Sequence, residues 1–125
     1  MEGSTFMITG IGLDIVEISK IKKIMNRSDK FAKRILSTRE WAIYEDLSTS
    51  RKGEFLAGRF AAKEAYSKAN GTGIGGKCTF QQIEILNDSL GKPVLLFNEQ
   101  EVNGFVSITH TETVAAAQVI LQTNV

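Results

Sequence analysis

The period of the hydrophobic pattern changes about halfway along the chain, and this change is the strongest constraint on the fold. Up to Ala69, apolar residues recur at intervals of three and four, which is typical of helices packed on one side. From Thr79 onward, the apolar segments are short and rich in strand-forming residues. Helices in the first half and strands in the second predict an α+β domain with a largely antiparallel sheet.

Helices are predicted from the spacing of apolar residues and from the residues that start and stop helices. Ser37 followed by Glu40 forms a capping-box pattern, and Asp14 followed by Glu17 is a variant of it. Asn70–Gly73 tolerates the left-handed backbone of a helix end. The predicted helices are Ile15–Met25, Lys30–Leu36, a segment beginning at Ser37–Glu40, and a long central helix over Glu54–Ala69, with a polar loop at Ser48–Gly53.

One early segment and four late segments are predicted strands. The early strand would place Gly10 and Gly12 on one face and Ile11 and Leu13 on the other. We expect a single domain over residues 7–125, preceded by a candidate vector-derived leader at residues 1–6. The predicted strands are Met7–Leu13, Thr79–Leu86, Pro93–Phe97, Phe105–Thr111 and Val114–Leu121, with Glu99–Gly104 left unassigned.

Length and cysteine content narrow the class of protein. The chain has 125 residues, of which 42% are hydrophobic, and this suits one domain with a modest core. No apolar run is long enough to cross a bilayer, and no stretch has the order of a secretory signal. Cys78 is the single cysteine, so an internal disulfide is excluded. We therefore predict a cytoplasmic protein that does not bind membranes.

Basic residues are concentrated between Glu17 and Arg39, although the net charge of the whole chain is only +1. This segment has eight basic residues against two acidic ones, a local net charge of +6. Such a surface can attract an acidic partner, while a well-solvated helix face would explain it equally well. The basic residues are Lys20, Lys22, Lys23, Arg27, Lys30, Lys33, Arg34 and Arg39.

Two carboxylates are candidate ligands of a hard cation. Asp14 would continue the face of Gly10 and Gly12 if the strand runs that far, with open space in front of it. Glu64 lies on the long predicted helix beside a row of small residues, one turn before Lys68. Each has a simpler explanation, because Asp14 can cap a helix and Glu64 can pair with Lys68. Magnesium is held by one or two carboxylates with water and phosphate, so the two could share it.

The only histidine, His110, lies near the end of a predicted strand, on the same face as Val106 and Ile108. A lone histidine is more often a core or surface residue than a catalytic one. With one cysteine and one histidine, the chain lacks the usual ligand sets for zinc.

The loop Gly71–Cys78 nearly fits the phosphate-binding P-loop pattern. A P-loop follows a strand and precedes a helix, and here a helix precedes and a strand follows. We therefore reject a P-loop, and the N–H groups of this loop remain only a candidate anion site.

Three motifs resemble, in the same order, those of the bacterial holo-acyl-carrier-protein synthases of the 4′-phosphopantetheinyl transferase family. They are Gly10–Glu17 (GIGLDIVE), Phe55–Ala65 (FLAGRFAAKEA) and Val106–Thr111 (VSITHT). Gly71–Gly75 and Gly91–Pro93 also match, so the resemblance covers nearly the whole chain. It implies transfer of the 4′-phosphopantetheine arm of coenzyme A to a serine of apo-acyl-carrier protein, in support of fatty acid biosynthesis. Adenosine 3′,5′-bisphosphate is the implied second product.

The resemblance also implies a role for each candidate residue. Asp14 and Glu64 match the magnesium ligands of the family, and Glu64 matches the residue that activates the serine hydroxyl, directly or through water. Lys68 matches the lysine near the pyrophosphate, so Glu64 and Lys68 are the implied catalytic residues. Arg59, Lys68 and His110 match residues that bind coenzyme A, Arg59 and His110 on its nucleotide side.

The basic segment after Asp14 matches the surface on which the family docks acidic acyl-carrier protein. The implied contacts of the carrier protein are Lys20, Lys23 and Arg27. Lys20 stands where related sequences often have arginine, and a lysine cannot make the bidentate contact of arginine. Short members of the family are homotrimers with sites between subunits, so the resemblance implies a homotrimer here.

Two other functions remain open at the level of sequence. A coenzyme A-binding module could use the basic helix to recruit an acidic protein without transferring anything. A nucleic-acid-binding domain could use the same +6 segment, but the chain has no recognisable helix-turn-helix or ribonucleoprotein motif. We therefore predict no nucleic-acid partner.

Overall fold

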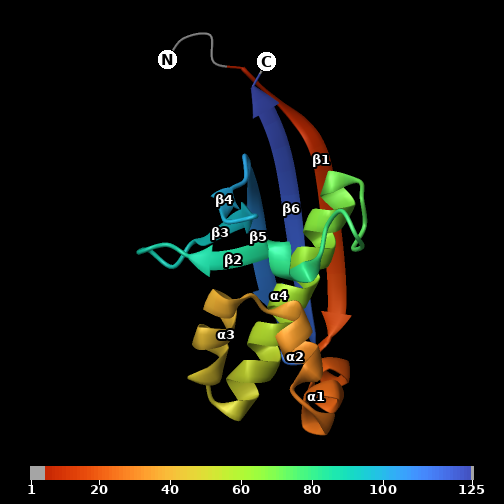
Figure 1. Ribbon diagram of the computed structural model, residues 1–125, viewed down its shortest axis with the longest axis vertical. Coiled ribbons are helices and arrows are strands. Elements are labelled where there is room, and N and C mark those ends of the chain that lie inside the picture. Colours follow the sequence, from red (N-terminus) through yellow and green to blue (C-terminus); the bar gives the residue numbers. More distant parts are fainter. Residues whose placement is uncertain (1–4, 125) are drawn as a thin grey trace.

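Residues 5–124 are described by a computed structural model (Figure 1). Its elements, in chain order, are β1 (Phe6–Glu17), α1 (Ile18–Arg27), α2 (Lys30–Ile35), α3 (Thr38–Glu45), α4 (Thr49–Asn70), the 3₁₀ helix η1 (Phe80–Gln82), β2 (Ile83–Asn87), β3 (Pro93–Phe97), β4 (Gln100–Glu101), β5 (Gly104–His110) and β6 (Val114–Asn124). No helix within residues 5–124 combines the length and the apolar character that a membrane span requires.

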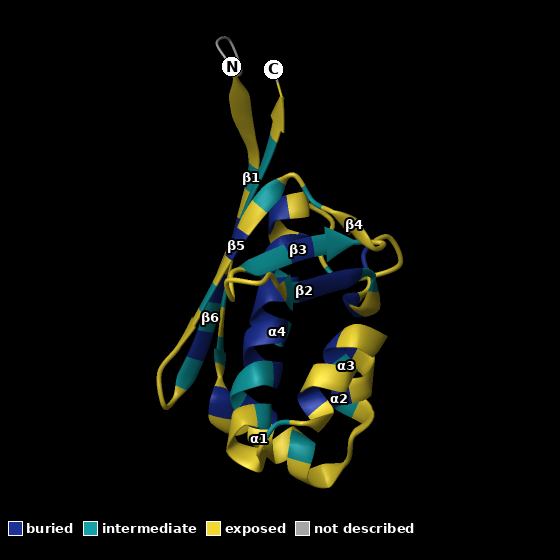
Figure 2. Cartoon of the chain, turned by 90° about the vertical axis from the view of Figure 1, so that its left-hand side faces the viewer, coloured by how far each residue is buried: buried dark blue, intermediate teal, exposed yellow. Residues whose placement is uncertain are grey.

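The strands form two three-stranded antiparallel sheets, which confirms the predicted α+β fold. One sheet has the order β1-β6-β5 and the other β2-β3-β4. The helix α4 lies against one face of the β1-β6-β5 sheet, and α1, α2 and α3 gather around the first half of α4 (Figures 1 and 2). The helices and the second sheet thus cover the same side of the first sheet.

The contact between α4 and β1 depends on two glycines. A Cβ atom built on Gly10 or Gly12 would overlap the carbonyl oxygen of Ala69 or Ala65, respectively. Ala65 is fully buried and Ala69 nearly so, which places the small side chains of α4 in the core. The predicted faces of β1 are confirmed, because Gly12 is buried while Leu13 is exposed. The helix therefore approaches the strand more closely than larger residues would allow.

Two predicted helix boundaries are wrong. The first strand continues to Glu17, so Ile15 belongs to β1 and α1 begins at Ile18. The interpretation of Asp14 as a helix cap is wrong for the same reason: β1 pairs with β6 along this whole stretch. The predicted loop at Ser48–Gly53 is also wrong, since the Ser48 side chain accepts a hydrogen bond from the Arg51 backbone N–H and starts α4.

Other boundaries agree with the sequence prediction. The capping box at Ser37 and Glu40 is formed, and α4 ends at Gly71 with a positive φ of 85°. The strand β3 has the predicted bounds, whereas the predicted strand Thr79–Leu86 begins with a 3₁₀ turn that Thr79 caps. Residues 1–4 of the candidate leader lie outside the described residues, and Phe6 is the first residue of β1.

Two hydrophobic clusters share α4 as their common wall. One lies between the second half of α4 and both sheets and includes Tyr66, Ile83 and Val119. The other lies among α1, α2, α3 and the first half of α4 and includes Ile21 and Leu56. Because α4 borders both, its position determines how its polar residues meet those of the strands.

Candidate active site

Asp14 lies on the face of β1 that Gly10 and Gly12 turn toward α4. Its Oδ1 atom accepts a hydrogen bond from Lys68 Nζ at 2.9 Å. The same ammonium group donates to the carbonyl oxygen of Leu13 at 3.1 Å. The strand β1 thus runs far enough to present the Asp14 carboxylate to α4. The interpretation of Asp14 as a cation ligand required this, and its interpretation as a helix cap did not.

Glu64 faces the same Asp14–Lys68 pair from α4. Burial raises the pKa of Glu64 most, the negative charge of Asp14 raises it further, and the positive charge of Lys68 opposes them. The two carboxylates are therefore close enough to repel each other. Lys68 binds Asp14 and not Glu64, so the simple Glu64–Lys68 surface pair that the sequence allowed is not formed.

The two carboxylates fit the magnesium ion that the resemblance implies. A divalent cation would relieve their repulsion, and magnesium needs only one or two carboxylates because water and phosphate oxygens complete its shell. Within residues 5–124, no three or more histidine, cysteine, aspartate or glutamate side chains are grouped closely enough to hold a metal. The donor set therefore suits magnesium bound together with a substrate phosphate, not a cage made by the protein alone.

Arg59 lies on α4 and is only 8% exposed. Its Nη2 atom donates to the carbonyl oxygen of Ile85 and to Oδ1 of Asn87, both at 3.0 Å. Its guanidinium carbon lies 4.3 Å from the centre of the Phe55 ring. The buried Nε atom has no hydrogen-bond partner among the described residues, and it lies 4.0 Å from Oε2 of Glu40.

His110 lies at the end of β5, where its Nδ1 atom is 3.3 Å from Oε2 of Glu54. A cavity of about 320 Å³ connects His110 with Arg59. Glu54 and Asn87, which the sequence analysis missed, line this cavity because tertiary packing brings them there and no local motif marks them. The full lining is Ile43, Leu47, Arg51, Glu54, Phe55, Gly58, Arg59, Asn87, Ile108 and His110.

The predicted site residues fall into two groups within one chain. Asp14, Glu64 and Lys68 meet where α4 crosses β1, while Arg59 and His110 line a cavity beside β5. The strands β1 and β5 are the two edges of one sheet, with β6 between them. The structure therefore brings together the members of each group but not the two groups.

The predicted docking residues all lie on the exposed side of α1. Lys20, Lys23 and Arg27 point away from the buried Ile18 and Ile21. The nearest acidic neighbour of Lys20 is Glu17, at 3.9 Å on the surface. The structure thus places a solvent-accessible basic helix directly after the strand that holds Asp14.

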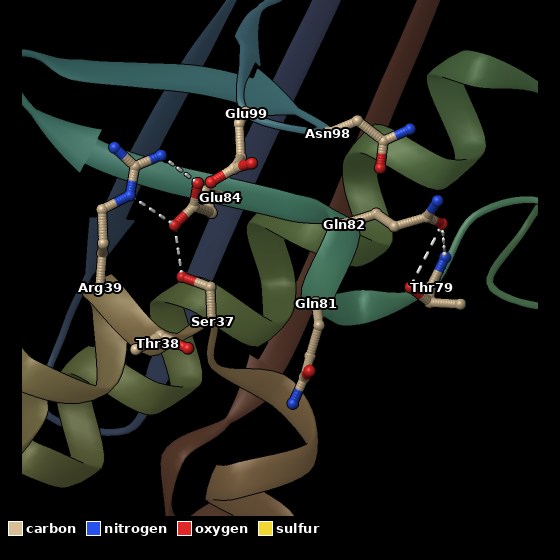
Figure 3. A pocket seen from close by; sticks show the side chains of 9 residues that line it. All are labelled: Ser37, Thr38, Arg39, Thr79, Gln81, Gln82, Glu84, Asn98 and Glu99. Carbon is tan, nitrogen blue, oxygen red and sulfur yellow. Dashed lines mark hydrogen bonds and ion pairs between the residues drawn. The ribbon is translucent and has the colours of Figure 1, made fainter.

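A further polar cavity, of about 620 Å³, lies between α3 and the second sheet (Figure 3). Arg39 binds both carboxylate oxygens of Glu84, and the Ser37 hydroxyl donates to Glu84 at 2.7 Å. These hydrogen bonds, that of Arg39 first, lower the pKa of Glu84 despite its burial. Arg39 and Glu84 of this cavity thus satisfy each other.

Comparison with known proteins identifies the family of the chain. The sequence model of the 4′-phosphopantetheinyl transferase superfamily matches residues 10–121. The chain is similar to holo-[acyl-carrier-protein] synthases of Bacillus subtilis strain 168, at 53% identity over 93% of the chain and 97% of the relative, and of Geobacillus sp. strain WCH70, at 52% over 93% and 98%.

Among solved structures, the chain is similar to a holo-(acyl-carrier-protein) synthase from Bacillus anthracis strain Ames in complex with coenzyme A (3′,5′-ADP). The TM-score is 0.83 at 49% identity, over 94% of this chain and 98% of the other. A synthase from Helicobacter pylori in complex with coenzyme A gives a TM-score of 0.77 at 34% identity, over 90% and 99%. The motifs, the fold and these similarities show that this chain belongs to the 4′-phosphopantetheinyl transferase superfamily.

Proposed function

We propose that this chain is a magnesium-dependent holo-[acyl-carrier-protein] synthase. It transfers the 4′-phosphopantetheine group from coenzyme A to a serine of apo-acyl-carrier protein and releases adenosine 3′,5′-bisphosphate. The observation that carries the proposal is the meeting of Asp14, Glu64 and Lys68 in a chain that is similar to a synthase over 93% of its length. No feature of the structure favours the alternative of a coenzyme A-binding module without transfer activity.

The chemistry requires a base for the serine hydroxyl and positive charge near the pyrophosphate. Glu64 has the raised pKa that suits proton acceptance, because burial and Asp14 make its carboxylate more basic. Lys68 is half exposed and can turn its ammonium group from Asp14 to a phosphate oxygen. Magnesium held by Asp14 and Glu64 would neutralise charge on the phosphates, the main requirement of such transfers.

The nucleotide side of coenzyme A is assigned to the cavity beside β5. Arg59 offers a cation that lines this cavity, and His110 lies half exposed at its rim. Glu54 holds the His110 ring by the contact between Oε2 and Nδ1. A phosphate entering here would meet Arg59, and it would compete with Glu54 for His110.

The basic face of α1 is assigned to the acidic acyl-carrier protein. Lys20, Lys23 and Arg27 are exposed on the helix that directly follows β1, so a partner bound there lies near Asp14. This proximity is what transfer to a serine of the carrier protein requires. We assign the reaction to fatty acid biosynthesis in the cytoplasm and the whole activity to a single domain over residues 7–125.

A homotrimer with sites between subunits is supported by the uncovered face of the first sheet. Ile11, Leu13, Ile15 and Phe105 are each more than half exposed on the side away from α4. Such a continuous apolar surface is unusual on a monomer. Association through it also offers a way for the two groups of site residues, which lie at opposite edges of this sheet, to meet across a subunit boundary.

Mixing two inactive variants tests the shared site. Glu64→Gln inactivates the group of site residues where α4 crosses β1. His110→Ala inactivates the group that lines the cavity beside β5. If sites are shared, trimers formed from both variants regain part of the activity, because some boundaries carry both intact groups. A fully active monomer in analytical ultracentrifugation would contradict the assembly while leaving the reaction standing.

The reaction itself is tested by mass spectrometry of apo-acyl-carrier protein incubated with this protein, coenzyme A and magnesium. We expect a mass gain of one phosphopantetheine group, lost with Glu64→Gln or with a chelator. Tight binding of coenzyme A without any mass gain would favour the binding module instead.

A further inference from the structure

A second ion pair on α4, between Lys63 and Glu40 of α3, lies in the interior and takes no part in the proposed chemistry. Both side chains have no exposed surface, and Lys63 Nζ lies 2.6 Å from Oε1 of Glu40. A lysine and a glutamate are almost never fully buried unless they are paired and hydrogen-bonded. Lys63 directly precedes Glu64, so whatever holds Lys63 also restrains the metal-binding and catalytic position.

The hydrogen bonds of this pair join α4 to α2, α3, η1 and β2. Lys63 Nζ also donates to the carbonyl oxygens of Ile35 at 2.6 Å and of Phe80 at 3.0 Å. Its three donors are thus all used. Ile35 is the last residue of α2 and Phe80 the first of η1. The ammonium group is therefore fixed by three separate segments of the chain.

Glu40 is fixed with equal completeness. Its carboxylate accepts hydrogen bonds from the backbone N–H groups of Ser37 and Ile85, both at 2.9 Å, in addition to the one from Lys63. Ile85 lies in the middle of β2, so the carboxylate connects α3, β2 and α4. Arg59 Nε, one helical turn before Lys63, lies 4.0 Å from Oε2 of the same carboxylate.

The helix is thus held from two sides. On one side, the glycines of β1 let α4 approach closely, and the only side-chain hydrogen bonds between the described residues of α4 and β1 are those of the half-exposed Lys68. On the other side, the bonds of Glu40 and Lys63 have fixed lengths and directions, so they restrict both rotation of α4 and sliding along its axis. A small rotation would move Glu64 relative to Asp14, and a misplacement of about 1 Å can cost about 100-fold in rate.

We propose that Glu40, through its buried bonds to Lys63, is a positioning residue that holds Glu64 opposite Asp14. The proposal rests on the transferase function proposed above. Glu40 touches neither substrate nor metal and acts only through the placement of α4. The divalent-ion affinity and the turnover of the folded protein then depend on Glu40, in addition to its stability.

The test compares Glu40→Gln with Glu84→Gln. Both variants replace a buried carboxylate that connects α3 with β2, but of the two only Glu40 accepts a hydrogen bond from α4. Binding of Mn²⁺, followed by electron paramagnetic resonance as a magnesium substitute, is measured together with kcat for carrier modification. The fluorescence of Trp41, the single tryptophan, and circular dichroism report whether α3 stays folded beside the substitution.

For folded Glu40→Gln, we expect Mn²⁺ binding and kcat each to fall about tenfold, while folded Glu84→Gln keeps both within about twofold. Glu40→Asp keeps the charge but shortens the arm by one methylene, and a partial loss of both is expected. If Glu40→Gln does not fold, Glu40→Asp provides the test in its place. Unchanged Mn²⁺ binding and kcat in the folded variants would overturn the proposal and leave Glu40 a stabilising residue only. Inactivity of the wild type would instead contradict the proposed function.

Discussion

Two lysines of α4, five residues apart, form ion pairs of similar length in opposite surroundings. Lys63 pairs with Glu40 at 2.6 Å where neither side chain is exposed. Lys68 pairs with Asp14 at 2.9 Å, where the side chains are 52% and 17% exposed. A ligand cannot reach the buried Lys63–Glu40 pair. In the other pair, Lys68 can exchange Asp14 for a phosphate, and Asp14 can exchange Lys68 for a metal ion. Accessibility, more than distance, separates the pair that stabilises the fold from the pair available for chemistry.

The same substitution at both lysines separates these roles, and the largest expected effect is on stability. Lys63→Met leaves the buried Glu40 carboxylate without its hydrogen-bonded counter-charge and with only Arg59 Nε at 4.0 Å, so the free energy of unfolding falls by about 3–5 kcal/mol. Lys68→Met removes a partly exposed pair and costs less than about 1 kcal/mol. Urea denaturation followed by circular dichroism measures both. Equal losses for the two variants would remove the basis of the contrast.

The order of the two variants reverses for catalysis. Lys68→Met removes a positive charge near the proposed pyrophosphate position, and we expect a loss of about 100-fold in kcat with the fold intact. Lys77→Met is a suitable control, because Lys77 is an exposed lysine that the site does not use. Initial rates of holo-carrier formation provide the measurement, and a rate for Lys68→Met equal to that of the control would rule out a catalytic role for Lys68.

A smaller effect on the rate is expected where a charge acts only on the association of the enzyme with the carrier protein. Lys20→Glu on the exposed side of α1 should slow modification of the carrier about tenfold at low salt, since like charges then meet across the interface. The difference from wild type should shrink as salt rises, because exposed charges are screened over about 8 Å at physiological ionic strength. Coenzyme A affinity by calorimetry should not change. Loss of that affinity with normal carrier binding would reverse the assignment of surfaces.

The smallest expected effect is a pair of opposite pH dependences in metal-free buffer. The pKa of Glu64 is raised, so its contribution to stability falls as the pH rises from the ordinary carboxyl range to the raised pKa. The pKa of Glu84 is lowered, so its contribution is present above the ordinary range and is lost as the pH falls toward the lowered pKa. From acidic to neutral pH, Glu84→Gln should therefore first lose stability relative to wild type, below the ordinary carboxyl pKa, and Glu64→Gln should gain it above that pKa. Thermal melts across that range should show the two trends, and parallel trends would contradict them.

Local patterns together with the family resemblance pointed to one of the two ion-paired regions. The glycines of β1 and the motif around Glu64 predicted a carboxylate pair at a strand and a helix, and Asp14 and Lys68 lie there. The Glu40–Lys63 pair was missed, because its members are 23 residues apart and Glu40 was already explained as part of a capping box. Only tertiary packing shows that this capping carboxylate also binds a lysine.

The missed boundaries have a similar origin. Ile15 has helical spacing with Ile18 and Ile21, but pairing with β6 keeps it in an extended strand. The polar residues after Ser48 look like a loop, yet one serine cap allows them to form the first turn of α4. In both places a long-range or capping interaction overrides the local pattern.

The most direct test of the accessible pair as the catalytic centre is the magnesium dependence of carrier modification by Asp14→Asn. The rate of holo-carrier formation is followed by mass spectrometry over a range of magnesium concentrations, with circular dichroism as the check on folding. If Asp14 holds the metal with Glu64, the variant folds normally, needs about tenfold or more magnesium for half-maximal rate, and remains slower at saturation. A folded Asp14→Asn with the rate and the magnesium dependence of wild type would contradict the assignment of this site.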